Sequence, residues 1–132
     1  MSVVKNKRKT AYPMFVFNAI QLWEYTMQKC AKFPKRYDHS LNDRITDAAC
    51  NAYLNVCHAN SVYPSTPAEV QIRRAYLSKA TGDLNSLVLF LNVAEDKYDI
   101  HENVILEWNR LIDLEFRLID GVRKKDSKLF SS

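Results

Sequence analysis

The sequence predicts an all-α protein, organised as an antiparallel, up-down-up-down four-helix bundle. Four segments place apolar residues three or four positions apart, which is the spacing that lines one face of a helix. Glycine occurs twice and proline four times in 132 residues, which suits long helices better than strands and tight turns. Connections of roughly five to ten residues separate the segments, so consecutive helices are expected to pack against each other.

The longest helical repeat covers residues 67–96. Its apolar residues recur every seven positions, at Val70, Leu77, Leu84 and Leu91, with Ala80, Leu87 and Ala94 at the second seam position. Thr66 or Ser65 supplies a capping hydroxyl, Pro67 suits the first turn, and Glu69 places a carboxylate near the positive end of the helix. This pattern predicts a helix that begins at Pro67 and packs one face into the bundle core.

The other three segments predict helices over about residues 13–31, 40–60 and 101–120. The first carries Val16, Ile20, Trp23, Met27 and Cys30 on one stripe, which we interpret as core. The second has small inner residues that permit close helix approach, namely Leu41, Ile45, Ala48, Ala49, Ala52, Val56 and Ala59. The last carries Ile105, Trp108, Ile112, Ile119 and Val122, and Gly121 is a natural residue to follow a helix end.

Residues 87–91 read Leu-Val-Leu-Phe-Leu and are therefore apolar on every side of the third helix. A surface helix in a monomeric bundle keeps one polar face, so this run predicts burial on two sides. We interpret Val88, Leu89 and Phe90 as the contact between subunits of a homo-oligomer.

Charge is distributed unevenly along what we interpret as a single domain spanning residues 1–132. Residues 1–36 carry eight Lys or Arg against one acid, residues 37–120 carry seven against thirteen, and residues 121–132 carry four against one. The sequence therefore predicts a basic N-terminal arm (about 1–12) and a basic C-terminal tail (about 121–132). Such runs can be solvated tails or can contact phosphate groups.

The predicted topology brings the start of the first helix, the start of the third and the end of the fourth to one end of the bundle. That end would hold a positive pole suited to nucleic acid. The candidate nucleic-acid-binding residues are Lys5, Lys7, Arg8, Lys9, Arg73, Arg74, Lys79, Arg123, Lys124 and Lys125. For Arg73, which occupies a seam position, the alternative is a structural role with the side chain reaching to the bundle end.

Several function classes find no support in these residues. The longest apolar run is far shorter than the ~20 residues that span a bilayer, so no membrane partner is expected. Three cysteines within helical patterns indicate reduced thiols and a cytoplasmic location. We find no Glu-x-x-His pair, Gly-rich phosphate loop or nucleophile elbow. The sequence accordingly predicts no catalytic residue, no metal site and no cofactor.

Short motifs in the first, second and fourth predicted helices, and in the turn after the first, resemble a family of small bacterial four-helix-bundle proteins. The family comprises proteins encoded within intervening sequences of large-subunit ribosomal RNA and the accessory variability determinant proteins (Avd) of diversity-generating retroelements. The resemblance covers roughly residues 13–125 and is carried by Trp23, residues 32–35, Leu41, residues 44–45, residues 59–60 and residues 108–111. Long basic arms, the Arg73-Arg74 pair and the absence of an Ala-Glu-Gly ending after Asn60 favour the accessory branch.

The resemblance implies a homopentameric barrel of bundles with a positive surface. It implies a non-catalytic accessory subunit that binds the retroelement reverse transcriptase and its template RNA, and possible RNA–DNA hybrids, to support mutagenic cDNA synthesis. Two alternatives stay open. One is a structural oligomeric scaffold of the intervening-sequence type, with protein partners or general RNA binding, and the other is an enzyme such as a nuclease.

Overall fold

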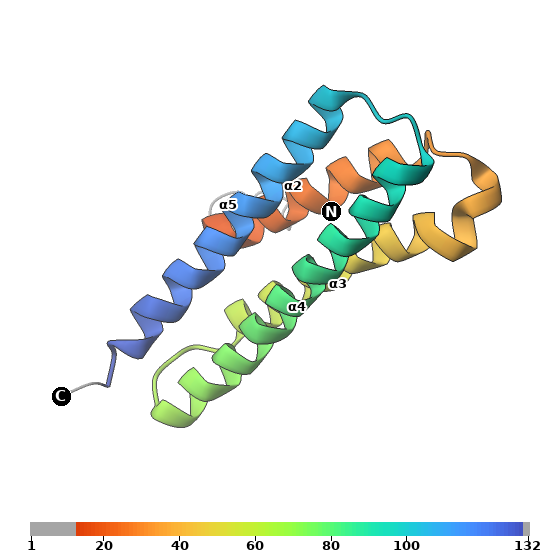
Figure 1. The fold of residues 1–132 in the computed structure, drawn as a ribbon. Coiled ribbons are helices and arrows are strands. Elements are labelled where there is room, and N and C mark those ends of the chain that lie inside the picture. The colour runs from red at the N-terminus through yellow and green to blue at the C-terminus, as the bar shows by residue number, and fades with distance from the viewer. Residues whose placement is uncertain (1–12, 131–132) are drawn as a thin grey trace, which may run out of the picture.

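The computed structural model describes residues 13–130, and within that range the chain is helical and contains no strand (Figure 1). Four long helices follow one another along the chain. They are α2 (Met14–Cys30), α3 (Asp43–Ser61), α4 (Pro67–Lys97) and α5 (Glu102–Ser127), with the short turns η1 (Lys35–Tyr37) and η2 (Asp38–Asn42) between α2 and α3. The prediction of an all-α protein with four helices is confirmed.

Long-range hydrogen bonds define how the helices meet. Asn18, near the start of α2, donates its side-chain amide to the carbonyl of Leu111 in the middle of α5. Tyr25, near the end of α2, donates to the carbonyl of Val104 at the start of α5. Asn55 of α3 donates to the Asp83 carboxylate of α4 at 2.7 Å. Each helix therefore lies along a neighbour over several turns, as Figure 1 shows.

The core forms where the α4 seam meets the small side chains of α3. The seam residues Leu77, Leu84 and Leu87 are fully buried, as are Ile45 and Val56 of α3. Each buried leucine or isoleucine contributes roughly 1.5–3 kcal/mol of transfer free energy. All of the predicted inner residues of the second helix are buried, so its small side chains allow α3 and α4 to pack closely.

The buried face of α2 differs from the predicted stripe. Met27 is 40% exposed, and Trp23 and Ile20 are only half-buried, whereas Asn18 and Thr26 are fully buried. Buried polar groups are stable when they are hydrogen-bonded, and Trp108 of α5 donates its indole N–H to the Thr26 hydroxyl at 2.9 Å. The sequence prediction considered only apolar residues and therefore missed the buried polar positions Asn18 and Thr26. As a result, the predicted buried face was centred too close to Met27.

The start of α4 agrees with the sequence. The Thr66 hydroxyl accepts a hydrogen bond from the backbone N–H of Glu69, and the Glu69 carboxylate accepts from the Thr66 and Ser65 hydroxyls. This is a capping box, and it satisfies N–H groups that the first helical turn leaves unpaired. The helix then continues without interruption to Lys97.

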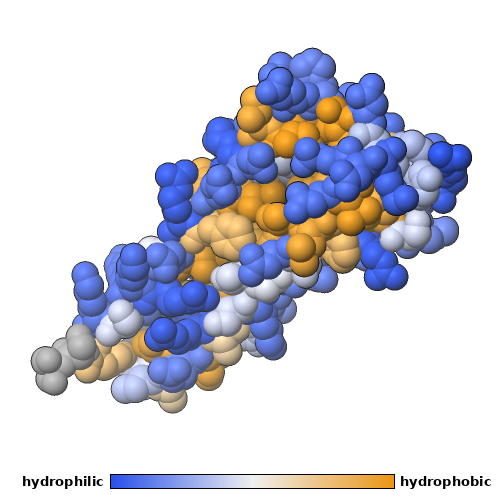
Figure 2. Space-filling view, in the orientation of Figure 1, coloured by the Kyte–Doolittle hydropathy of each residue, from blue (hydrophilic) through white to orange (hydrophobic). Residues whose placement is uncertain are grey.

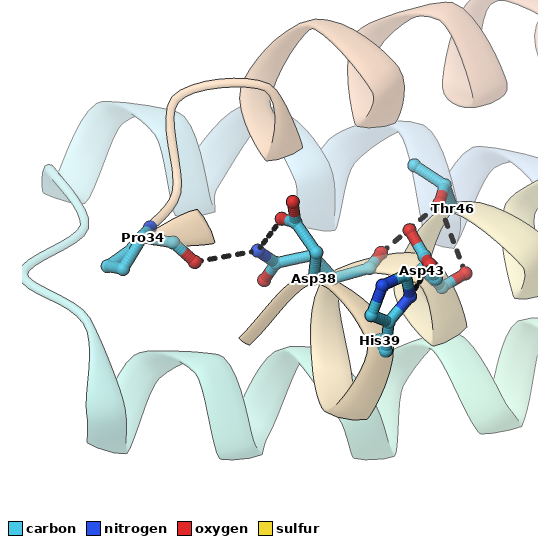
Figure 3. A network of polar contacts seen from close by, with 6 residues as sticks. Pro34, Asp38, His39, Asp43 and Thr46 are labelled. Carbon is cyan, nitrogen blue, oxygen red and sulfur yellow. Dashed lines mark hydrogen bonds and ion pairs between the residues drawn. The ribbon is translucent and has the colours of Figure 1, made fainter. Parts of the chain in front are cut away.

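Asn42 organises the connection between α2 and α3 (Figure 3). Its side-chain amide donates to the carbonyl of Pro34 and to the Asp38 carboxylate, and its side-chain oxygen accepts from the Tyr98 hydroxyl at 2.7 Å. These bonds hold residues 38–42 in a π turn. The α-helix consequently begins at Asp43, three residues later than Ser40, where the sequence predicted its start.

The last helix is longer than predicted. Residues 121–127 continue α5 to Ser127, so the prediction that Gly121 ends the helix and opens a C-terminal tail is wrong. Gly121 has helical backbone geometry with no positive φ. The extension has a tertiary cause, because Val122 packs against the core and Asp126 forms a buried ion pair with α4.

Candidate nucleic-acid interface

Exposed cations lie on the N-terminal half of α4 and on the last turns of α5. Arg74 and Lys79 are exposed on α4, Lys124 and Lys125 are exposed on α5, and Arg123 is half-buried. The predicted contacts Lys5, Lys7, Arg8 and Lys9 lie outside the described residues.

Arg123 lies between α4 and α5. Its Nη2 is 3.4 Å from the hydroxyls of both Ser78 and Thr81, while its buried Nε has no hydrogen-bond partner. Arg74 precedes Ser78 by one helical turn, so the two residues share a face of α4. By this spacing Arg74 and Arg123 lie at the same edge between α4 and α5.

Lys79 belongs to a different side of α4. Five residues separate it from Arg74, which is about 140° around a helix. Its Nζ lies 5.4 Å from the ring centroid of Tyr76, and that ring contacts His58 of α3 at 5.1 Å. Lys79 thus faces the α3 side, and it does not extend the edge formed by Arg74 and Arg123.

The last turns of α5 carry the remaining predicted cations. Lys124 pairs with Asp120 one turn earlier at 3.1 Å, and both side chains are exposed. Exposed pairs of this kind are weak, typically under 1 kcal/mol, so Lys124 can exchange its carboxylate for a phosphate. Lys125 is exposed beside it.

Arg73 is buried, and the prediction that it lies on an accessible surface is wrong. Its Nε donates to Asp126 at 2.7 Å and its Nη2 to the same carboxylate at 3.4 Å. Its Nη1 donates to the carbonyls of Ala59 and Val62 at the end of α3. The guanidinium therefore joins α3, α4 and α5, and these four hydrogen bonds occupy donors that a phosphate would need.

A buried carboxyl group near the middle of α5 was not predicted. Glu115 is fully buried; its Oε1 accepts from the Asn18 amide at 3.0 Å, and its Oε2 has no partner. Burial raises the pKa of Glu115 to about 8, and the hydrogen bond from Asn18 acts in the opposite direction. The spacing of Trp108, Ile112, Glu115 and Ile119 puts this residue on the core stripe, which is the signal that sequence reading could have used.

The three residues predicted to form the subunit contact differ in their exposure. Val88 and Phe90 are half-buried against the core, whereas Leu89 is 65% exposed. Figure 2 shows apolar surface gathered along the middle of the face on which α4 and α5 lie. Leu89 is therefore the residue of the three that is most available to another subunit.

Two of the three cysteines, Cys30 and Cys50, have thiols that burial makes less acidic. Burial raises the pKa of Cys30 to about 12, with a smaller contribution from the negative charge of Asp43, and burial also raises that of Cys50. Thiols with raised pKa values are poor nucleophiles. Within residues 13–130, no group of three or more His, Cys, Asp or Glu side chains could hold a metal ion.

Comparisons with known proteins leave the family open. A scan against protein-family models, a search of curated proteins and a search of solved structures each found no match to this chain. No helix in the described part of the chain is both long and apolar enough to cross a membrane. The site must therefore be interpreted from its own residues.

Proposed function

We propose that this protein is a non-catalytic, RNA-binding accessory subunit of a diversity-generating retroelement. In this role it binds template RNA, or an RNA–DNA hybrid, through the cations of α4 and α5 and also binds the reverse transcriptase. It acts in the cytoplasm, where its cysteines stay reduced. The proposal that the protein binds RNA rests on the edge formed by Arg74 and Arg123. The proposal that it binds a reverse transcriptase rests on the family resemblance alone.

The chemistry of this edge suits a phosphate backbone. Arginine presents a planar set of hydrogen-bond donors that matches the oxygens of a phosphate group. When Lys or Arg side chains neutralise phosphates, the counterions of the nucleic acid are released into solution, which favours binding. The adjacent Ser78 hydroxyl provides a further donor for a phosphate oxygen. Arg73 is not part of the proposed contact because its donors are already occupied.

We further propose that the helices form an antiparallel bundle and that several bundles assemble into a homo-oligomeric barrel. The family resemblance implies five subunits. Asn18, near the start of α2, bonds to Leu111, whereas Tyr25, further along α2, bonds to Val104, which lies earlier in α5; this reversed order supports the antiparallel arrangement. The exposed Leu89 supports the subunit contact. Several weak phosphate contacts on one ring would strengthen one another through effective concentration.

Reversing two exposed cations tests the RNA contact. The Arg74→Glu/Lys124→Glu double variant is expected to lower affinity for a structured RNA at least tenfold at low salt, because phosphate contacts become repulsions. Lys124 is the exposed cation next to Arg123 on α5. The slope of log affinity against log salt, which is negative, should become less negative by about two. Binding is measured by fluorescence anisotropy over a series of monovalent salt concentrations.

The matched control reverses two exposed cations elsewhere, as Lys32→Glu/Arg44→Glu, with the same change in net charge. This variant should keep the wild-type slope. Equal losses in both double variants would show that only net charge matters, and the proposed edge would then be rejected.

A single substitution tests the subunit contact. Leu89→Glu places a charge at a mostly exposed apolar position, so it should convert the oligomer to monomer while the far-ultraviolet circular dichroism stays unchanged. Leu54→Glu, at an exposed leucine of α3, is the control and should keep the wild-type mass. Sedimentation velocity measures both, and an assembled Leu89→Glu protein would place the contact elsewhere.

A structural scaffold with protein partners is the second candidate. It is favoured by the exposed apolar side chains Leu89, Val93 and Leu106 on α4 and α5. It predicts weak RNA binding in the wild type that neither double variant changes.

A further inference from the structure

A groove of about 430 Å³ lies between the C-terminal half of α2 and the N-terminal half of α3. Residues of the turns η1 and η2 complete its lining at the end of the molecule away from the Arg74 and Arg123 edge. Its lining includes Trp23, Met27, Lys35, Asp38, Asp43 and Asp47. No part of the proposed RNA interface uses these residues.

The α2 side of the groove is apolar and aromatic. Met27 is 40% exposed and Trp23 is half-buried, whereas Phe15 and Leu22 of the same helix are buried in the core. The Trp23 ring stacks on Tyr53 of α3, with centroids 5.4 Å apart and an angle of 22° between the rings. Such stacking fixes the indole, whose face attracts cations and packs against methylene groups.

The α3 side is acidic. Asp43 and Asp47 are one helical turn apart and therefore share a face of α3, and Asp38 adds a third carboxylate from η2. Asn42 holds the Asp38 carboxylate, and His39 contacts that of Asp43 at 3.2 Å (Figure 3). Against these three carboxylates, Lys35 is the one cationic side chain in the lining.

The end of α2 also borders the groove, and Lys29 in its last turn lies outside the lining. Met27, Cys30 and Ala31 belong to its last turn or follow it directly, and the C-terminal end of a helix carries a partial negative charge. Carboxylates, a helix C-terminus and an aromatic face all favour a positively charged ligand. The apolar side requires that the ligand also carry hydrocarbon.

We propose that this groove binds an aliphatic diamine or polyamine, with its ammonium groups against the carboxylates and its methylene chain against Trp23 and Met27. The carboxylates are distributed along the groove. In the described residues they form no three-donor group able to hold a metal ion, so separated positive charges fit them better than one compact ion. The proposal is independent of RNA binding.

Titration of the full-length, nucleic-acid-free protein with 1,5-diaminopentane tests this site. Isothermal titration calorimetry at low salt should show saturable binding, about tenfold tighter than for pentylamine and for pentane-1,5-diol. These two compounds keep the chain but lose one or both charges. Tryptophan fluorescence should change along the same curve, because the ligand covers Trp23. Absent saturation, or equal affinity for the diol, would overturn the proposal.

Two variants locate the binding. Asp47→Asn should weaken diamine affinity about threefold to fivefold, as expected for loss of one partly screened ion pair, whereas Asp113→Asn on the exposed face of α5 should not. Met27→Lys places a competing ammonium group in the groove and should abolish binding. Circular dichroism checks that each variant is folded. Equal effects of the two aspartate variants, or diamine binding by folded Met27→Lys protein, would reject the groove as the site.

Discussion

Replacing Arg73 by methionine is expected to lower the free energy of unfolding by about 3–5 kcal/mol. The substitution removes the two hydrogen bonds to Asp126 and the two to the carbonyls of Ala59 and Val62. It leaves the Asp126 carboxylate, only 8% exposed at its side chain, without a partner. Urea unfolding followed by circular dichroism measures the loss.

The neighbouring Arg74→Met variant is the control, and its stability should stay within about 0.5 kcal/mol of wild type because Arg74 is exposed. The Arg73→Met/Asp126→Leu double variant should be more stable than Arg73→Met alone, since it no longer leaves a charge buried. If Arg73→Met were as stable as Arg74→Met, the ion pair would not hold the three helices together.

Replacing Glu115 by glutamine is expected to stabilise the protein by on the order of 3 kcal/mol at pH 7.5. The folded state holds the Glu115 proton up to a pKa of about 8, whereas the ordinary value is 4.5. The folded state therefore binds more protons than the unfolded state between these values, and wild-type stability falls as pH rises through this window. Glutamine keeps the oxygen that Asn18 requires and never ionises.

The test is the free energy of unfolding from pH 4 to pH 8.5. Wild type and Glu115→Gln should be close at pH 4 and should diverge up to about pH 8. Asp113→Asn, an exposed carboxylate on the same helix, should follow the wild-type curve. A Glu115→Gln protein less stable than wild type at pH 7.5 would mean that the carboxylate is ionised and paired.

Helix positions could be read from the sequence because their causes are local. Pro67, the Thr66 hydroxyl and the Glu69 carboxylate act within one turn, and the structure has this helix start where the sequence put it. The seven-residue repeat likewise identified Leu77 and Leu84, because side chains at that spacing must share one face.

The candidate site was predicted only in part. The sequence identified Arg74, Lys79, Lys124 and Lys125 as cations, and their exposure agrees with the expectation for long charged side chains. For Arg73, at a seam position, it left a structural role and a nucleic-acid contact both open, because the deciding partner, Asp126, lies more than fifty residues further along the chain. The length of α5 depends on the same distant pair.

The sequence by itself determined the helical class, the four segments and the apolar faces of α3, α4 and α5, since propensity, capping and periodicity are properties of neighbouring residues. Only the tertiary structure decided which polar residues are buried in the core and which Lys and Arg side chains stay exposed on the surface. Asn18 with Glu115, and Arg73 with Asp126, are buried because each finds its partner on another helix. A buried polar group is stable only with such a partner, and the partner is chosen by packing and not by spacing along the chain.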